Sequence, residues 1–288
     1  MKMNHDKGMR MSVGIIGCGW LGSVLAKRLI QAGDEVIATA TQKNTLTALF
    51  EQGIKAVKLE LPVTSIKDEL LSNTVFTMQQ LVICIPPQVK KGLTNYPEKI
   101  RQLVQAAENS GVKRLILLSS TAVYGGLEGK IDENSALDIS IEKVNIIAKA
   151  EQNVLNFKGD SCVVRLGGLI GPKRHPGRFL SGKKQLMNPS APVNLIHQQD
   201  AIGIIDCLLQ QEIIKSRQTI FNCVCSTHPQ RKDFYQAAAK AMNLPQPIFV
   251  EEELLTIANT KKVCGNKVTQ ELGYKFVIDD LLLWVSCE

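Results

Sequence analysis

Three glycines spaced as G-x-G-x-x-G form the most informative motif of the chain. Gly17, Gly19 and Gly22 follow a short apolar run and precede an amphipathic stretch. At this spacing the first glycine permits a tight turn, the second lets another molecule approach the backbone, and the third lets a helix pack closely on a strand. The N-terminus of such a helix offers free N–H groups and partial positive charge to phosphate. We therefore expect the turn, with Trp20 and Leu21 at the start of its helix, to bind the pyrophosphate of a dinucleotide.

The residues after the next apolar run bear on the choice between NAD and NADP. NAD is usually recognised by an acidic side chain at the end of the second strand, which accepts hydrogen bonds from the ribose 2′-hydroxyl. Residues 36–43 contain no acid, but they contain Thr41 and Lys43. These two side chains could bind a 2′-phosphate through charge-assisted hydrogen bonds. The sequence therefore favours NADP. NAD is the alternative, and Lys43 would then be a solvated lysine at the start of a helix.

The first half of the chain alternates β-branched runs with helical patterns, and these elements would position the motifs. Strands alternating with helices of this length predict the α/β class, as a Rossmann-type, doubly wound parallel sheet. The first helix is expected to end at Gly33, a residue suited to the left-handed conformation. The expected strands are 13–16, 35–38, 55–59, 81–85 and 114–118, and the expected helices are 21–32, 45–52 and 97–109.

The second half is less regular and predicts a small substrate lobe at the C-terminal end. We expect a flexible extension over 1–11, an NAD(P)-binding domain over 12–166, and a substrate lobe over 167–288 that is interleaved with the last strands and helices of the sheet. The expected elements are a helix at 141–157, a strand at 162–166, a loop-rich segment at 167–192, a helix at 200–210, a strand at 219–224, a helix at 231–242 and a short tail.

Composition excludes several classes of protein. Aromatic residues make up only 5% of the chain, and the net charge of +7 arises without a long basic run. These features argue against nucleic-acid binding and favour anionic small molecules as partners. The eight cysteines form no C-x-x-C pair, and the four histidines have no ligand-like spacing with them. We therefore expect free thiols in a reducing compartment and no metal site.

The apolar run at 13–25 could be mistaken for a signal peptide. Glycines interrupt it, and it continues into Lys27 and Arg28 rather than into a small-residue cleavage site. A glycine-rich turn explains the run better, and no other stretch approaches the length of a membrane span. We expect a cytoplasmic protein without a membrane partner.

Several motifs together resemble the extended short-chain dehydrogenase/reductase superfamily, and within it the NAD-dependent epimerase/dehydratase family. The resemblance covers nearly all of residues 12–275. It implies that Ile85, Pro86, Pro87 and Ser119 flank the cofactor, and that Gly168 lies near the nicotinamide at the entrance to the substrate lobe. Besides the glycine turn, the motifs are Cys84-Ile85-Pro86-Pro87, Leu118-Ser119-Ser120-Thr121-Ala122-Val123-Tyr124-Gly125, Asp132-Glu133, Arg165-Leu166-Gly167-Gly168-Leu169-Ile170-Gly171-Pro172, and Asn194-Leu195-Ile196-His197 followed by Asp200.

The usual catalytic residues of this superfamily are only partly present. They are a Ser or Thr beside a Tyr-x-x-x-Lys on the following helix, whose spacing places both side chains on one face. Ser120 stands at the Ser/Thr position, but the tyrosine and lysine positions hold Lys143 and Ile147. None of the four tyrosines has a lysine four residues later. The chain therefore resembles the atypical subgroup, which keeps the cofactor turn and lacks the standard dyad.

Three interpretations of the catalysis stay open. Lys143 could act as an acid or base, but it would need strong desolvation to lose its charge near neutral pH. Tyr124 could donate a proton while Ser120 orients the substrate, or it could simply pack beneath the cofactor loop. Otherwise the protein uses residues that the sequence does not identify, or it is a non-catalytic NADP(H)-binding redox sensor or regulator.

Cationic side chains gather where members of the family meet their substrates. Arg174 and Arg178 lie in a segment that also contains Lys173 and Lys183-Lys184. They would suit a phosphate- or carboxylate-bearing ligand, unless the segment is only a solvated loop. The leading prediction is an NAD(P)-dependent, epimerase/dehydratase-like oxidoreductase for a small, polar, anionic substrate. Members of the superfamily often form homodimers through helices, so the resemblance also suggests a homodimer.

Overall fold

The structure is a computed structural model that describes residues 10–211, 218–250 and 260–287. Most of the extension predicted over 1–11 lies outside the described residues. A seven-stranded sheet has the order β10-β7-β5-β4-β1-β2-β3, and the pairings of β1 with β2 and β4, of β2 with β3, and of β4 with β5 are parallel. This arrangement confirms the predicted α/β, Rossmann-type sheet. The strands are β1 Ser12–Ile16, β2 Glu35–Ala40, β3 Ala56–Lys58, β4 Gln80–Ile83, β5 Arg114–Ser120, β7 Asp160–Leu166 and β10 Gln218–Cys223.

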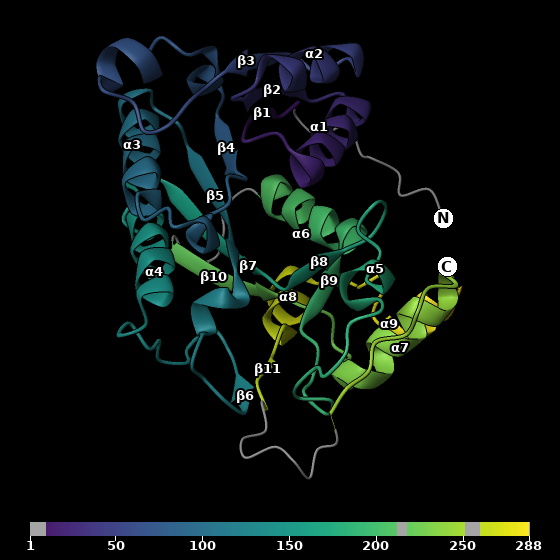
Figure 1. The fold of residues 1–288 in the computed structure, drawn as a ribbon. Coiled ribbons are helices and arrows are strands. Elements are labelled where there is room, and N and C mark those ends of the chain that lie inside the picture. Colours follow the sequence, from purple (N-terminus) through teal and green to yellow (C-terminus); the bar gives the residue numbers. More distant parts are fainter. Residues whose placement is uncertain (1–9, 212–217, 251–259, 288) are drawn as a thin grey trace. The chain divides into compact units, whose positions relative to one another are not determined.

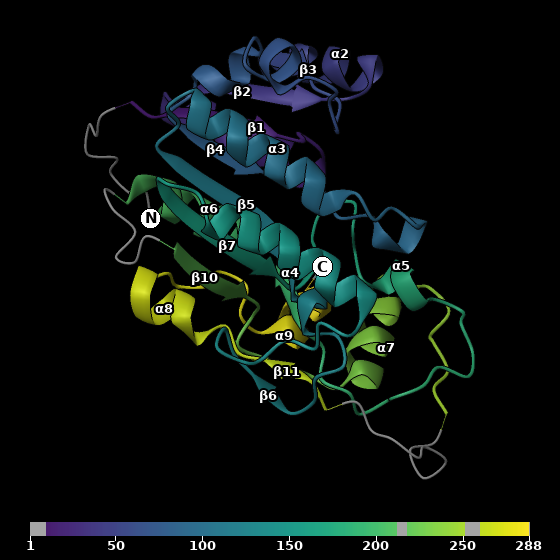
Figure 2. The same ribbon diagram turned by 90° about the vertical axis from the view of Figure 1, so that its left-hand side faces the viewer.

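Helices cover the strands on both sides. Figure 1 shows α1 on one face of β1 and β4 and α3 on the other, and Figure 2 shows α3 and α4 in front of the strands. The Nδ2 of Asn153 in α4 donates to the carbonyl oxygen of Pro97 in α3 at 3.0 Å, which joins the two helices. As predicted, α1 ends at Gly33, where φ is +95°. These helices are α1 Trp20–Ala32, α2 Lys43–Glu51, α3 Tyr96–Asn109 and α4 Glu142–Leu155.

Apolar side chains between the strands and helices α3 and α4 form the larger core. Leu81 and Ile83 of β4 pack with Leu115 and Leu117 of β5 and with Ile100 of α3, and all five are completely buried. Burial on both faces explains why β4 and β5 consist of continuous apolar runs. The carboxyl ends of these strands are thereby held in a fixed position.

The chain divides into two compact units. The first unit comprises residues 1–119, 145–164 and 208–220, and it contains the glycine turn. The second comprises residues 120–144, 165–207 and 221–288. The bounds of these compact units do not coincide with the expected boundary between the NAD(P)-binding domain and the substrate lobe after residue 166. That functional boundary stays a prediction.

The second unit contains short elements that the sequence did not predict. Strand β8 lies within the expected loop-rich segment and pairs with β9, with Gly168 opposite Leu195. In the expected tail, β11 pairs with β6, with Lys262 opposite Lys130. The loop-rich and tail assignments were therefore wrong in part, because such short strands gain their stability from partners distant in sequence. These elements are β6 Lys130–Ile131, β8 Gly168–Ile170, β9 Leu195–His197, β11 Lys262–Val263, α5 Gly177–Leu180, α8 Asn266–Leu272 and α9 Leu281–Cys287.

Two longer helices, α6 (Gln198–Gln210) and α7 (Arg231–Ala241), were predicted to within two residues at each end. Figure 1 shows α7 beside α9, and a second core joins them through Phe234, Ala238 and Leu281. None of the eight cysteines forms a disulfide bond. In the described part of the chain no group of side chains is suited to hold a metal ion, and no helix is long and apolar enough to cross a membrane.

Candidate functional site

The turn between β1 and α1 needs its three glycines for different reasons. Gly17 has a φ of +87°, and a Cβ there would lie 2.6 Å from the Cγ2 of Ile85. At Gly22 a Cβ would lie 3.2 Å from the Cγ2 of Ile15, so α1 packs directly on β1. At Gly19 a Cβ would meet no atom within 4 Å. The fold therefore requires the first and third glycines, whereas the second leaves an open space for another molecule.

Thr39 on β2 anchors this turn. The backbone N–H of Gly17 donates to the Thr39 hydroxyl at 3.0 Å, and the N–H of Cys18 donates to the Thr39 carbonyl at 2.8 Å. Helix α1 then starts from Gly19 without a side-chain cap. An uncapped helix N-terminus beside an open backbone is a suitable place for phosphate. The sequence did not reveal Thr39, because a buried threonine inside a strand has no distinguishing pattern.

A pocket with a volume of about 280 Å³ opens at the carboxyl ends of β1, β2 and β4. This edge of an open parallel sheet is where ligands bind in doubly wound folds. None of the described residues that line the pocket is acidic. They are Ile16, Gly17, Cys18, Gly19, Thr39, Ala40, Thr41, Gln42, Thr45, Leu59, Leu61, Ile85, Pro86, Gln88 and Lys99.

The predicted cofactor residues divide into those in the pocket and those around it. Trp20 and Leu21 begin α1, with Leu21 buried, and Gly22 lies beneath the turn. Lys43 is exposed on the first turn of α2, and neither Lys43 nor Pro87 is among the lining residues. The predicted residues that line the pocket are Gly17, Gly19, Thr41, Ile85 and Pro86.

Lys99 is a lining residue that the sequence analysis missed. It lies on α3, is half-buried, and supplies the cationic side chain among the described residues of the pocket. No motif marks this lysine, because only the folding of α3 against the sheet brings it beside the segment after β2. It places a positive charge in a pocket that otherwise offers hydroxyl, amide and apolar groups.

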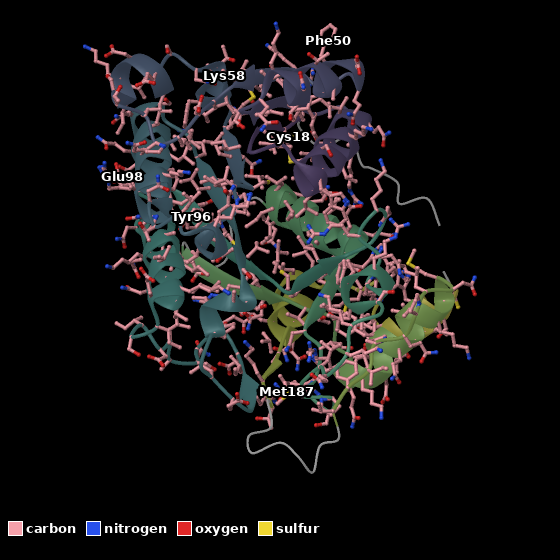
Figure 3. The ribbon with its side chains drawn as sticks, in the orientation of Figure 1. Cys18, Phe50, Lys58, Tyr96, Glu98 and Met187 are labelled. Atoms are coloured by element: carbon pink, nitrogen blue, oxygen red, sulfur yellow. The ribbon has the colours of Figure 1, made fainter. Side chains whose placement is uncertain are left out.

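Buried polar groups lie at the end of β5, within the first unit. The hydroxyl of Ser119, another predicted cofactor residue, donates to the Oε1 of Glu151 at 2.5 Å, and both side chains are buried. Tyr96 lies on the inner side of α3, whereas Glu98 lies on the outer side (Figure 3). Burial, and then the charge of Glu151, raise the pKa of Tyr96 far above its ordinary value. The bond between Ser119 and Glu151 holds the strand end in place, and Tyr96 is not an acid or base poised for neutral pH.

Cys18, labelled at the start of α1 in Figure 3, is the side chain between the first two glycines of the turn. Burial raises the pKa of its thiol to about 12. The thiol therefore stays protonated near neutral pH, and a protonated thiol is a poor nucleophile. Cys18 therefore packs within the turn and is not a reactive thiol.

Tyr124, a predicted catalytic residue, is completely buried in the second unit. Its hydroxyl donates to the Oδ1 of Asn222 at 2.8 Å and accepts a hydrogen bond from the Nη1 of Arg165 at 2.7 Å. The Arg165 guanidinium also lies 4.9 Å from the centre of the tyrosine ring. Burial raises the pKa of Tyr124 although Arg165 opposes the change. These contacts give Tyr124 a packing role, and its role as proton donor stays a prediction.

The other two predicted catalytic residues, Ser120 and Lys143, also lie in the second unit. The Ser120 hydroxyl accepts a hydrogen bond from the Ala122 N–H at 3.1 Å and so caps the 3-10 turn Thr121–Tyr124. Lys143 is half-buried on the first turn of α4. The structure adds Lys261, whose Nζ donates to the carbonyl oxygen of Tyr124 at 3.5 Å. No sequence pattern marks Lys261, because more than a hundred residues separate it from this segment.

The predicted substrate residues also lie in the second unit. A pocket of about 360 Å³ is lined by Gly171, Pro172, Lys173, His175, Arg178 and Met242, so it includes the predicted Arg178. Arg174 is exposed, and its N–H donates to the Gly171 carbonyl at 2.9 Å. Gly168 donates its N–H to the Asn194 carbonyl at 2.8 Å. The structure thus places Arg178 beside Lys173 and His175, with Arg174 and Gly168 outside this pocket.

Trp284 of α9 lies against two histidines of the second unit. Its ring centre lies 5.7 Å from that of His175 and 5.1 Å from that of His197. The Nδ1 of His197 accepts a hydrogen bond from the Gln199 N–H at 3.2 Å, and the side chain is buried. His197 therefore has a structural position.

Comparisons with known proteins agree with this geometry. A family model described as NAD(P)H-binding matches residues 17–193. The Escherichia coli K12 protein YeeZ is 31% identical over 278 residues, which cover 94% of this chain and 97% of YeeZ.

Two solved structures share the fold at lower identity. One is the Bordetella bronchiseptica enzyme WbmH in complex with NAD+, with a TM-score of 0.73 and 19% identity over 96% of each chain. The other is the Bacillus cereus UDP-glucuronic acid 4-epimerase in complex with UDP-glucuronic acid and NAD, with a TM-score of 0.74 and 15% identity over 95% of this chain and 97% of the epimerase. These likenesses confirm the predicted Rossmann-type fold, and the resemblance to the extended short-chain dehydrogenase/reductase superfamily agrees with them. Membership of the atypical subgroup stays a prediction.

Proposed function

The chain belongs to the NAD(P)H-binding family whose model it matches over residues 17–193, and from this premise we propose that it is an NADP(H)-dependent oxidoreductase for a small, anionic substrate. The observation that carries the proposal is the open backbone at Gly19, at the mouth of the 280 Å³ pocket. A side chain at Gly17 or Gly22 would meet Ile85 or Ile15, whereas a side chain at Gly19 would extend into free space. A pyrophosphate group fits such a cradle and the helix N-terminus beside it.

The pocket residues support NADP over NAD. NAD recognition relies on an acidic side chain after the second strand, and the described lining residues include no acid. Thr41 and Lys99 offer a hydroxyl and an ammonium group, which suit a 2′-phosphate. Lys43 is exposed near Thr41 in sequence and is the second cationic candidate. We assign the main cationic role to Lys99, because it lines the pocket and Lys43 does not.

An anionic substrate is supported by the second pocket. Lys173 and Arg178 place two cationic side chains around His175, and Arg174 is close by in sequence. The Bacillus cereus epimerase that shares the fold was solved with a uronic-acid nucleotide, a ligand that carries carboxylate and phosphate groups. Arg and Lys side chains recognise both groups. We propose that Arg178 and Lys173 bind the substrate, with Gly168 and Arg174 at the edge of its site.

The bound nicotinamide would supply hydride chemistry, and the chain would have to orient the substrate and move a proton. Ser120, whose hydroxyl accepts a hydrogen bond from the Ala122 N–H, and Lys143 on α4 are the first candidates for these tasks. Tyr124 could act only if its bonds to Arg165 and Asn222 were rearranged. This constraint favours one second candidate function, a cofactor-bound redox sensor that does not catalyse the reaction.

The cofactor proposal is tested with two variants of the glycine turn. Gly19→Val is expected to abolish NADPH binding in a fluorescence titration while the melting temperature stays close to that of the wild type, because its side chain enters only the open space. Gly22→Val is the matched control, and it should lower the melting temperature because its side chain meets Ile15. Unchanged NADPH affinity in the folded Gly19→Val variant would contradict the assigned site.

Turnover is tested with a panel of sugar nucleotides and small carbonyl compounds, followed by nicotinamide absorbance. A substrate-dependent change supports the oxidoreductase. No change over the whole panel, together with clearly different affinities for NADP+ and NADPH, would support the redox sensor instead.

A further inference from the structure

The three N–H groups of the glycine turn before helix α1 have acceptors within the protein. The N–H of Gly17 donates to the Thr39 hydroxyl at 3.0 Å, and the N–H of Cys18 donates to the Thr39 carbonyl at 2.8 Å. The N–H of Gly19 donates back to the Gly17 carbonyl at 2.9 Å. These donors are therefore bound within the turn and the neighbouring strand β2. A pyrophosphate is then met by the first turn of α1, where the N–H groups of a helix have no intrahelical partner.

Thr39 reaches this turn through the pairing of β2 with β1. Ala38 lies opposite Ile15 in that pairing, so Thr39 follows where β1 approaches the turn. Its side chain is only 2% exposed, yet it is one of the residues that line the cofactor pocket. On the opposite side, a Cβ on Gly17 would lie 2.6 Å from the Cγ2 of Ile85, which follows β4. Gly17 is thus held between a hydroxyl from β2 and an apolar side chain that follows β4.

The Thr39 hydroxyl differs from the other acceptors of the turn because a substitution can remove it. The carbonyls of Thr39 and Gly17 belong to the main chain, which every residue carries. Without the hydroxyl, the Gly17 N–H loses its acceptor, and a buried donor left unsatisfied is costly. The turn regains a partner by rotating this N–H toward the pocket. Such a rotation displaces Gly19 and the start of α1, which together form the proposed pyrophosphate cradle.

We infer that Thr39 is a positioning residue for the cofactor, whose hydroxyl fixes the glycine turn so that the first turn of α1 faces the pyrophosphate. The inference rests on the proposed function, since it concerns the same pocket. The choice between NAD and NADP is assigned to other side chains, those of Thr41 and Lys99. Both dinucleotides contain the pyrophosphate, so Thr39 affects NADPH and NADH alike.

The experiment compares Thr39→Val, which replaces the hydroxyl by a methyl group, with Thr39→Ser, which keeps the hydroxyl. Fluorescence titrations of the full-length protein, well below its melting temperature, measure the affinities. Thr39→Val is expected to bind NADPH and NADH roughly three- to tenfold more weakly, because one hydrogen bond is lost. Thr39→Ser should bind both nearly as the wild type does, even though the loss of a buried methyl group lowers its melting temperature.

Two further measurements separate positioning from a general loss of structure. 2′-AMP, which contains adenosine and a 2′-phosphate but no pyrophosphate, should bind Thr39→Val as it binds the wild type. Without any nucleotide, the Gly17 amide hydrogen of Thr39→Val should exchange with solvent faster than in the wild type, as measured by NMR of glycine-labelled protein.

Thr47→Val is the matched control, because it makes the same chemical change on α2, outside the residues that line the pocket. The Thr47 hydroxyl is exposed and donates to the Lys43 carbonyl of its own helix at 3.2 Å. This variant should keep the wild-type affinities and the wild-type exchange rate of Gly17.

Unchanged affinities for NADPH and NADH in folded Thr39→Val would overturn the inference. An equal loss for 2′-AMP, or the same loss in Thr39→Ser as in Thr39→Val, would overturn it as well. A wild-type protein that binds neither dinucleotide would contradict the proposed function, whereas wild-type binding that Thr39→Val leaves intact would contradict only this inference.

Discussion

At the scale of single residues, Lys99 allows the cofactor preference to be tested directly. Lys99→Met is expected to weaken NADPH binding by roughly tenfold or more, because a hydrogen bond to a charged group contributes about 1.5–3 kcal/mol. NADH, which has no 2′-phosphate, should bind nearly as before. A fluorescence titration with both nucleotides measures the difference.

Lys43→Met is the matched control for that experiment. Lys43 is exposed outside the pocket, so its loss should change NADPH affinity much less. A larger effect of Lys43→Met than of Lys99→Met would show that Lys43, which the sequence favoured, binds the 2′-phosphate. Equal losses for NADPH and NADH in Lys99→Met would mean that Lys99 does not read the 2′-phosphate.

The residue scale also shows what a sequence can reveal of a site. Gly17, Gly19 and Gly22 were found because each has a backbone requirement that only glycine meets at low cost, and their spacing records it. Thr39 and Lys99 reach the site only through the fold. Thr39 contacts the turn from the neighbouring strand β2, and Lys99 lines the pocket from helix α3. A side chain brought in by tertiary structure has no local signature, so such residues were missed.

At the scale of elements, Asp200 joins the start of α6 to the segment 274–278. Its completely buried carboxyl group accepts hydrogen bonds from the Tyr274 hydroxyl at 2.9 Å and from the Val277 and Ile278 N–H groups at 2.7 and 3.0 Å. Asp200→Ala is expected to lower the free energy of unfolding by about 3 kcal/mol, because three hydrogen bonds to a buried carboxyl group are lost and each contributes about 0.5–1.5 kcal/mol. Urea denaturation measures the change.

Tyr274→Phe is the graded comparison for Asp200→Ala. It removes one of the three hydrogen bonds and should cost only about 0.5–1.5 kcal/mol. Equal losses in the two variants would show that the backbone bonds to Asp200 contribute little to stability.

Elements with a strong internal pattern were predictable, and elements defined by a distant partner were not. The bounds of α1 and α3 follow from apolar periodicity, with Gly33 ending α1, and the predicted starts lie one residue from the observed ones. Strands β8 and β11 have three and two residues, too few for any periodicity. Each is a strand only because β9 or β6 pairs with it, which no local rule can anticipate.

At the scale of the whole molecule, cofactor binding should raise thermal stability. A ligand that binds only the folded state at a concentration of 100 Kd stabilises it by about 2.7 kcal/mol. All described residues that line the cofactor pocket belong to the first unit. If calorimetry resolves two transitions, NADPH should therefore move the one that belongs to the first unit. Equal shifts by NADH and NADPH at equal concentrations would contradict the proposed preference for NADP.

The chain has two tryptophans, and the fold assigns one to each unit. Trp20 begins α1 beside Gly19, and Trp284 lies against His175 and His197 in the second unit. The protein thus carries a separate intrinsic fluorophore for each half. In the Trp284→Phe variant, the fluorescence of Trp20 reports whether the glycine turn is occupied. In the Trp20→Phe variant, the fluorescence of Trp284 reports changes around the second pocket. Events in the two units can be recorded one at a time, without an attached dye.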